Sequence, residues 1–179
     1  MTAQPEVTAL KDLEFISYLD DSGKLPELLE KKIGIYAIFN QDQVLQYVGY
    51  SRDIFLSLKQ HLVRQPDQCY GLKVLTIDRP SRSILESVQA AWIAENGSIP
   101  PGNSEQLDSW TQPINVKPMM TAAEEASYNQ EDEVGQEKVL KNVARRVEAE
   151  ILSVLKQRGM TEDIRFNPKL KTGGLLDLK

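Results

Sequence analysis

Hydrophobic and polar positions along the chain first predict a β-hairpin and a helix. Residues 32–39 and 44–50 are rich in β-branched and aromatic side chains and flank a polar turn, which is typical of two hairpin strands. Residues 72–77 have the same character and predict a third strand. Between the hairpin and this strand, apolar residues three or four positions apart predict a helix that is capped by Asp53 and ends before Pro66.

A second helix is predicted after the third strand. Its N-cap is Ser81 or Ser83, and Ser83 has capping-box spacing to Glu86. A short helix is also predicted at residues 25–30, before the hairpin. The order strand, strand, helix, strand, helix predicts an α+β fold, in which a small, mainly antiparallel sheet carries flanking helices.

The C-terminal part carries the clearest helical pattern of the chain, at residues 136–158. Gly159 supplies its stop, and its apolar stripe consists of Leu140, Val143, Val147, Ile151, Val154 and Leu155. Two uses of this amphipathic helix remain open: docking onto its own domain, or association with a second copy or another protein. Residues 105–135 lack periodicity and predict a mobile acidic connector without an active site, and the tail after Met160 predicts irregular structure.

These elements suggest four segments around a single core. They are an N-terminal extension at 1–30, an α+β domain at 31–104, the acidic connector at 105–135, and the C-terminal helix and tail at 136–179. Their formal charges are -5, +2, -6 and +4 in that order. The positive excesses are no larger than those of an ordinary solvated surface, so charge alone does not establish contact with nucleic acid.

The composition indicates a globular, non-membrane protein. The chain is 41% hydrophobic and 26% charged, and its apolar runs are far shorter than the roughly 20 residues that cross a bilayer. Met1 to Val7 show no secretory signal, so we expect a cytoplasmic compartment. Cys69 has no second cysteine to pair with and no metal-ligand spacing, which predicts a small buried hydrophobe.

The hairpin carries two tripeptides that together resemble a known signature. They are Gly34-Ile35-Tyr36 and Tyr47-Val48-Gly49, followed in order by His61, Glu86 and the stretch Pro100-Pro101-Gly102-Asn103. With these residues, positions 31–104 resemble a GIY-YIG nuclease domain. The resemblance implies a GIY-YIG endonuclease-like fold that hydrolyses DNA phosphodiesters with one divalent metal, Mg²⁺ or Mn²⁺.

The resemblance also implies a role for each of five candidate catalytic residues. Tyr36 would activate the attacking water, Tyr47 would orient the nucleophile and the phosphate, and His61 matches the family histidine. Glu86 would hold the metal, and Asn103 would close the site. We expect Tyr36, Tyr47, Glu86 and Asn103 to converge on one shallow cleft.

One family position departs from the pattern. The family places an arginine four residues before the histidine, where it stabilises charge on the phosphate, and this chain has Ser57 there. Loss of one such stabiliser lowers rates roughly 10²- to 10³-fold. Arg52, Lys59 and Arg64 offer charge nearby, but at other positions. The expected activity is therefore weak, and a non-catalytic module that binds nucleic acid or protein is the alternative.

A narrower resemblance is to the GIY-YIG-like domain of plastid monothiol glutaredoxins. The shared features are the Val48-Gly49-x-Ser51 stretch and the Pro-Pro-Gly-Asn close, whereas the glutaredoxin Cys-Gly-Phe-Ser motif does not occur here. This resemblance implies a cyanobacterial or plastid setting. Taken singly, the hairpin tyrosines also suit simple packing, and Glu86 suits helix capping.

Overall fold

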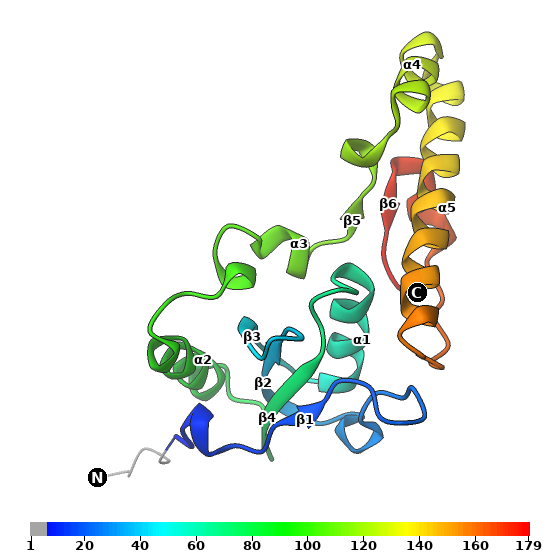
Figure 1. Ribbon diagram of the computed structural model, residues 1–179. Helices are drawn as coiled ribbons and strands as arrows, with labels where there is room; N and C mark the ends of the chain where they lie inside the picture. The colour runs from blue at the N-terminus through cyan, green and yellow to red at the C-terminus, as the bar shows by residue number, and fades with distance from the viewer. Residues whose placement is uncertain (1–6) are drawn as a thin grey trace. The chain divides into compact units, whose positions relative to one another are not determined.

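The computed structural model describes residues 7–179, which form two compact units, Met1–Trp110 and Thr111–Lys179 (Figure 1). The single core expected from the sequence was therefore wrong. Residues 1–6, which hold most of the stretch expected to lack a secretory signal, lie outside the described range. No helix formed by residues 7–179 combines the length and the apolar character that a bilayer-spanning helix requires.

The first unit contains a four-stranded antiparallel sheet with strand order β1-β4-β2-β3. Three strands confirm the predicted ones: β2 (Ile33–Phe39), β3 (Leu45–Ser51) and β4 (Gly71–Ile77). The fourth, β1 (Ile16–Ser17), is only two residues long and pairs with β4. Such a short strand leaves no periodic signal in the sequence.

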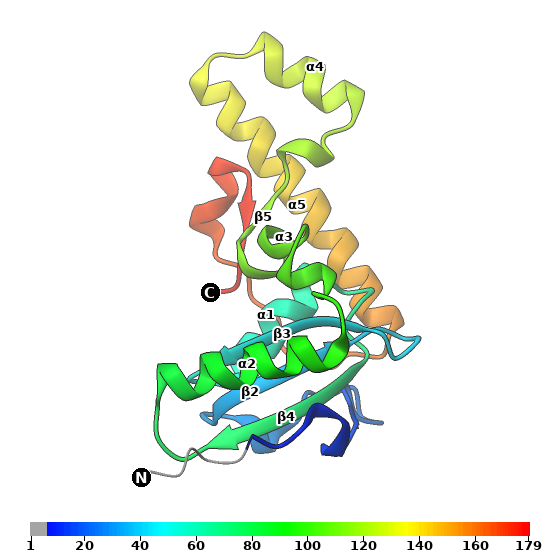
Figure 2. The same cartoon turned by 90° about the vertical axis from the view of Figure 1, so that its left-hand side faces the viewer.

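Two helices cover opposite faces of this sheet (Figure 2). Helix α1 (Ile54–Arg64) is capped by Asp53, whose side chain accepts from the Leu56 amide, as the sequence predicted. Helix α2 (Arg82–Asn96) is capped by Ser81 rather than by Ser83. The capping box suggested by Ser83 and Glu86 therefore does not form. The predicted α+β fold class, with flanking helices, is confirmed.

The strand register assigns the signature residues to one face of the sheet. Ile35 and Ala37 of β2 pack in one hydrophobic core with Leu85, Val88 and Trp92 of α2. Successive strand residues point to opposite faces. Tyr36, which lies between Ile35 and Ala37, therefore belongs to the other face, which α1 covers.

Short elements complete the first unit and begin the next. The 3-10 turns are η1 (Leu10–Asp12), η2 (Glu27–Leu29) and η3 (Pro101–Asn103), and η2 lies within the predicted short helix. Helix α3 (Leu107–Thr111) follows. The N-terminal segment is held to α2, because the Leu10 amide donates to Glu95 Oε2 at 2.7 Å.

The second unit is built around one long helix, and it corrects two predictions. Residues 105–135 and the tail, both expected to be irregular, contain α4, which is capped by a Thr121–Glu124 capping box, and a strand pair, β5 and β6. Neither segment has a strong hydrophobic periodicity, since both pack through few side chains. The elements are β5 (Ile114–Asn115), η4 (Lys117–Met119), α4 (Ala122–Gln130), α5 (Glu133–Gln157), η5 (Pro168–Gly173) and β6 (Leu175–Leu176).

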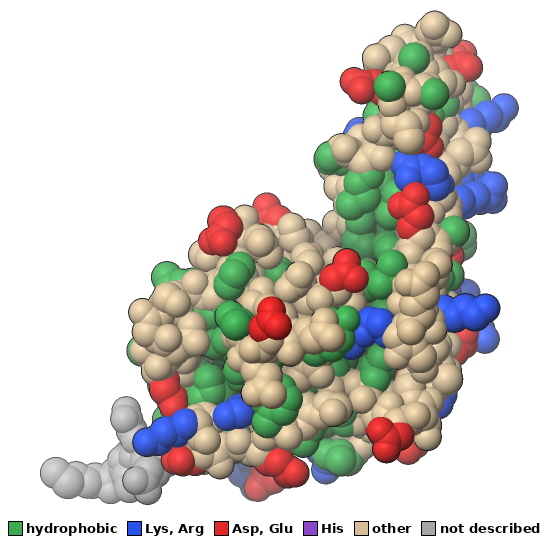
Figure 3. Space-filling model, in the orientation of Figure 1, with side chains coloured by type: hydrophobic (Ala, Val, Ile, Leu, Met, Phe, Trp, Pro, Cys, Tyr) green, Lys and Arg blue, Asp and Glu red, His purple; other side chains and the backbone are tan. Residues whose placement is uncertain are grey.

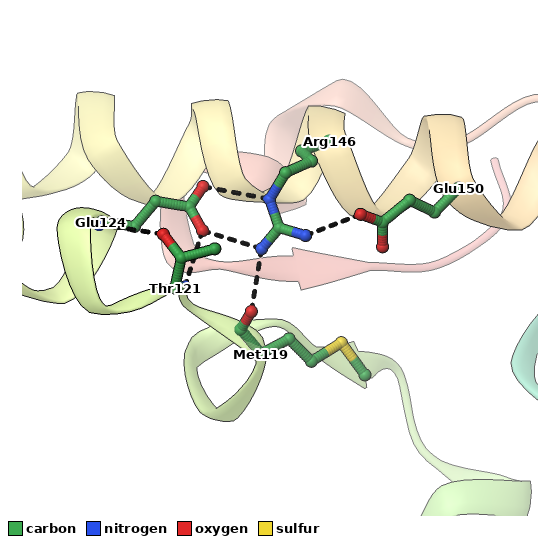
Figure 4. Close-up of polar contacts among 5 residues, drawn as sticks. All are labelled: Met119, Thr121, Glu124, Arg146 and Glu150. Carbon is green, nitrogen blue, oxygen red and sulfur yellow. Dashed lines mark hydrogen bonds and ion pairs between the residues drawn. The ribbon is translucent and has the colours of Figure 1, made fainter.

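Helix α5 buries its predicted stripe inside this unit. Leu140, Val143, Val147 and Leu155 are all buried, and η5, β6 and α4 pack against the helix. Docking within the chain's own fold is thus confirmed for these residues. On an adjacent side of the helix, Arg146 donates to both carboxylate oxygens of Glu124 and to Glu150 and the Met119 carbonyl, which ties α4 and η4 to α5 (Figure 4).

Candidate functional site at the signature tyrosines

Three of the predicted site residues meet on the α1 face of the sheet. The Tyr36 hydroxyl lies 2.7 Å from His61 Nε2, which is a direct hydrogen bond. The Tyr47 ring lies 4.8 Å from the His61 ring and 6.1 Å from the Tyr36 ring, centroid to centroid. The three side chains are buried, and Tyr36 is only 2% exposed. They form a closed aromatic cluster rather than the open cleft that we expected.

Gly49 makes this cluster possible. A Cβ atom built on Gly49 would lie 2.5 Å from the Tyr47 ring and 2.8 Å from the Tyr36 hydroxyl. Real Cβ atoms do not approach other atoms that closely, so any side chain here would displace the two rings. The glycine of the second tripeptide is therefore required by packing of the two tyrosines over its backbone.

Trp110 of α3 covers the cluster. Its ring stacks on Tyr47 at 5.4 Å with an interplanar angle of 11°, and lies 5.7 Å from the His61 ring. Trp110 is fully buried, whereas the residues at positions 104–109 are all exposed. A single side chain thus anchors this segment over the signature tyrosines.

Burial sets the ionisation of the cluster. Burial, assisted by Tyr47, raises the pKa of Tyr36 well above its ordinary value. Burial also raises the pKa of Tyr47, against the charge of Arg64. The pKa of His61 falls to about 3, chiefly through burial and further through the charge of Arg64, while the Trp110 backbone partly opposes the fall.

Neutral forms therefore dominate at neutral pH. A neutral His61 can accept the Tyr36 hydroxyl proton at Nε2 without charge separation. Full transfer of that proton would create a buried tyrosinate and a buried imidazolium, and both pKa shifts oppose this state. In the closed cluster the Tyr36 phenol stays protonated. Base catalysis by Tyr36 therefore requires the cluster to open.

Ser57 and Arg64 of α1 both lie near the tyrosine cluster. Ser57 lies beside Tyr36, whose pKa its hydrogen bond lowers, and its hydroxyl donates to Ser51 Oγ at 2.7 Å. Ser57 thus occupies the cluster side of α1, as predicted. Arg64 lies on the same helix face, seven positions further on, and its Nη1 donates to the Trp110 carbonyl at 3.2 Å. Its charge lowers the pKa of both tyrosines.

Asn103 forms hydrogen bonds with the backbone of β3. Its Oδ1 accepts from the Val48 amide at 2.8 Å, and its Nδ2 donates to the Val48 carbonyl at 2.9 Å. This side chain pairs with the middle of the Tyr47-Val48-Gly49 tripeptide as a neighbouring strand would. Asn103 therefore fixes the strand that carries Tyr47, and it contacts the site through the backbone.

Glu86 lies apart from the tyrosine cluster. It extends from α2, which covers the opposite face of the sheet, and its Oε1 accepts from Arg82 Nε at 2.7 Å and from the Tyr50 hydroxyl at 3.3 Å. The Arg82 hydrogen bond is the main cause that lowers the pKa of this exposed carboxylate. Because α2 and α1 pack on different faces, the expected convergence of Tyr36, Tyr47, Glu86 and Asn103 on one cleft is not seen among the described residues.

The resemblance implies that Glu86 would be the ligand of a divalent metal. Mg²⁺ needs oxygen ligands in octahedral geometry, and an arginine on the same carboxylate opposes a cation there. Among residues 7–179, no group of three or more His, Cys, Asp or Glu side chains is placed to hold a metal ion. The arrangement around Glu86 does not fit a metal site.

Comparison with known proteins finds similarity for part of the chain. No protein-family model matches it. Bifunctional monothiol glutaredoxin-S16, chloroplastic, from Arabidopsis thaliana is 36% identical over 74 residues. Part of this chain is thus similar to a plastid monothiol glutaredoxin. The match covers 39% of this chain and 25% of that relative, so the chain spans about a quarter of the relative's length.

Two cluster residues were not assigned to the site from the sequence. Arg64 was noted only as a nearby charge, although its helical spacing from Ser57 and His61 already placed the three on one face. Trp110 lies outside the 31–104 segment and carries no local signal. Only the fold of α3 brings it onto Tyr47.

Proposed function

We propose that the first unit is a GIY-YIG-type endonuclease-like module that acts on DNA phosphodiesters with weak activity. The observation that carries the proposal is the hydrogen bond between Tyr36 and His61, with Ser57 beside the phenol. The resemblance assigns activation of the attacking water to Tyr36, matches His61 to the family histidine, and places the phosphate-stabilising arginine at the position of Ser57. A mixed phenol and imidazole pair suits proton transfer once it is exposed to substrate.

Three features support a low rate. Ser57 carries no charge where the family has arginine, and Arg64 acts on the cluster only from two helical turns away. The Tyr36 phenol is buried with a raised pKa. Glu86, the metal ligand implied by the resemblance, pairs with Arg82 on the other face of the sheet. Each feature removes part of the electrostatic stabilisation that phosphodiester cleavage needs.

Plasmid nicking tests this proposal. Purified protein is incubated with supercoiled plasmid in Mg²⁺, Mn²⁺ or EDTA, and relaxed circles are counted over time. We expect slow nicking that Tyr36→Phe abolishes. The EDTA arm and Glu86→Ala test the metal dependence that the resemblance implies, and Glu27→Ala, which removes an exposed carboxylate of η2, is the matched control for Glu86→Ala.

The variant Ser57→Arg extends the same assay. It restores the cation at the position of the family arginine, so nicking should rise by about tenfold or more. Wild type and Ser57→Arg that both fail to nick in either metal, while remaining folded by circular dichroism, would refute the nuclease proposal.

The second candidate is a non-catalytic binding module with the same fold. It is favoured by the burial of Tyr36, by the stacking of Trp110 on Tyr47 and by the position of Glu86 on the other face of the sheet. On this proposal the protein binds nucleic acid or a protein partner without cleaving it. Fluorescence anisotropy with labelled DNA in EDTA, together with a negative nicking result, would favour this candidate. The narrower resemblance adds a cyanobacterial or plastid setting to both proposals.

A further inference from the structure

Helix α5 carries a line of cations on the side opposite its buried stripe. Lys138, Arg145 and Lys156 are seven and eleven residues apart, which is about two and three helical turns. Lys141 lies one turn from both Lys138 and Arg145, but it is half-buried. We call the three exposed cations, Lys138, Arg145 and Lys156, the α5 basic stripe. It extends for about 27 Å at the ordinary helical rise.

The stripe differs from the other cations around α5 in its ion pairs. Arg146 is paired with Glu124 and Glu150, and Lys171 with Glu148. None of the three stripe residues forms an ion pair or a side-chain hydrogen bond with any part of the chain that the structure describes. The ion pairs that hold α5 in its unit thus use Arg146 and Lys171. The α5 basic stripe faces solvent.

The acidic side chains of α5 are Glu133, Glu137, Glu148 and Glu150, and none of them lies on the line of Lys138, Arg145 and Lys156. Glu148 and Glu150 pair with Lys171 and Arg146. Between the stripe cations the helix presents only uncharged residues, Asn142, Ala149, Leu152 and Ser153. Figure 3 shows Lys and Arg side chains at successive levels along this helix. The result is a positive, acid-free line on a chain whose net charge is -5.

We propose that the α5 basic stripe binds the phosphate backbone of a nucleic acid. A row of cations at helical spacing matches a polyanion with closely spaced charges, and release of its counterions favours binding. An anionic membrane suits the helix less well, because a surface-bound amphipathic helix must insert its apolar face. Here that face is already packed inside the unit, with Val143 and Leu155 fully buried.

The choice of a polynucleotide as partner rests on the proposed function, but the surface does not depend on nuclease activity. The stripe belongs to the second unit, and the tyrosine cluster to the first. Binding and cleavage can therefore be measured and lost separately. The stripe supplies backbone contacts that hold the protein on its target without base specificity.

The test is DNA binding by the full chain, measured by anisotropy of a labelled duplex in EDTA from 50 to 200 mM salt. The stripe variant combines Lys138→Gln, Arg145→Gln and Lys156→Gln. The control combines Lys11→Gln, Lys32→Gln and Lys179→Gln, which are exposed cations elsewhere with the same charge change.

We expect the stripe variant to lose at least about tenfold in affinity at low salt. Its slope of log K against log salt should fall by about 2.7, the value for three lost phosphate contacts. The control should stay within about twofold of wild type. Circular dichroism checks that α5 remains folded in both variants.

Three outcomes would overturn the inference. They are equal losses in the stripe variant and the control, an unchanged salt slope in the stripe variant, and wild-type binding to vesicles of anionic lipid but not to DNA. Loss of nicking in Tyr36→Phe with DNA binding intact concerns the nuclease proposal alone. DNA binding that survives removal of the stripe refutes this inference whatever the nicking assay shows.

Discussion

The depressed pKa of His61 makes the stability of the first unit depend on pH. In the folded protein the pKa is about 3, and in the unfolded chain it returns to its ordinary value of 6.5. As the pH falls below 6.5 the unfolded chain takes up a proton, whereas folded His61 stays neutral. The unfolded state is then favoured, so stability present above pH 6.5 is lost progressively down to about pH 3.

The size of the effect follows from the two pKa values. Between pH 7 and pH 5 the unfolded histidine becomes almost fully protonated while the folded one does not. The difference lowers the free energy of unfolding by about 2 kcal/mol. This is a large fraction of the stability of an ordinary domain.

Urea unfolding measures this change directly. Trp92 and Trp110 are the two tryptophans of the chain, and both are buried in the first unit, so their fluorescence reports its unfolding. Wild type should lose about 2 kcal/mol more than His61→Gln when the pH changes from 7 to 5. Carboxylates that titrate in this range are common to both proteins and cancel in the comparison.

Two results would contradict the reasoning. The first is an equal loss of stability in wild type and His61→Gln. The second is an imidazole resonance that titrates near 6.5 in the folded protein, which is easy to assign because His61 is the single histidine of the chain. Either result would show that the cluster is open to water.

Three further changes test the packing of each unit. Trp110→Ala should lower the stability of the first unit by about 3 to 5 kcal/mol and raise the pKa of His61, as followed by NMR; an unchanged pKa would contradict the role of Trp110 as a cover. Gly49→Ala should cost about 1 to 3 kcal/mol, because its Cβ collides with two tyrosine rings, whereas Gly173→Ala, in open space, should be nearly neutral in urea unfolding. Val147→Glu should lower the melting temperature, at a cost on the order of 3 kcal/mol, without changing the mass found by light scattering, and exposed Ala149→Glu is its control. Dissociation of a dimer by Val147→Glu would instead show that the apolar side of α5 pairs two chains.

The local elements were determined by the sequence itself. The hairpin strands, the Asp53 cap and the long C-terminal helix each depend on side-chain periodicity and capping within a few residues, which the sequence displays directly. The contact between Tyr36 and His61 was not predicted, although the motif order named both residues. Both lie where strand alternation and helical spacing direct them.

Tertiary structure decided which of the candidate residues share a site. The position of Glu86 depends on which sheet face α2 covers, and its pairing with Arg82 and Tyr50 follows from that face. Trp110 reaches Tyr47 only because α3 folds back over a strand some 60 positions earlier in the chain. Contacts across such separations leave no local pattern, because nothing in the sequence near either residue depends on the other. For the same reason the sequence did not predict β1 or the β5–β6 pair. Each of these strands has two residues and forms only by pairing with a distant strand.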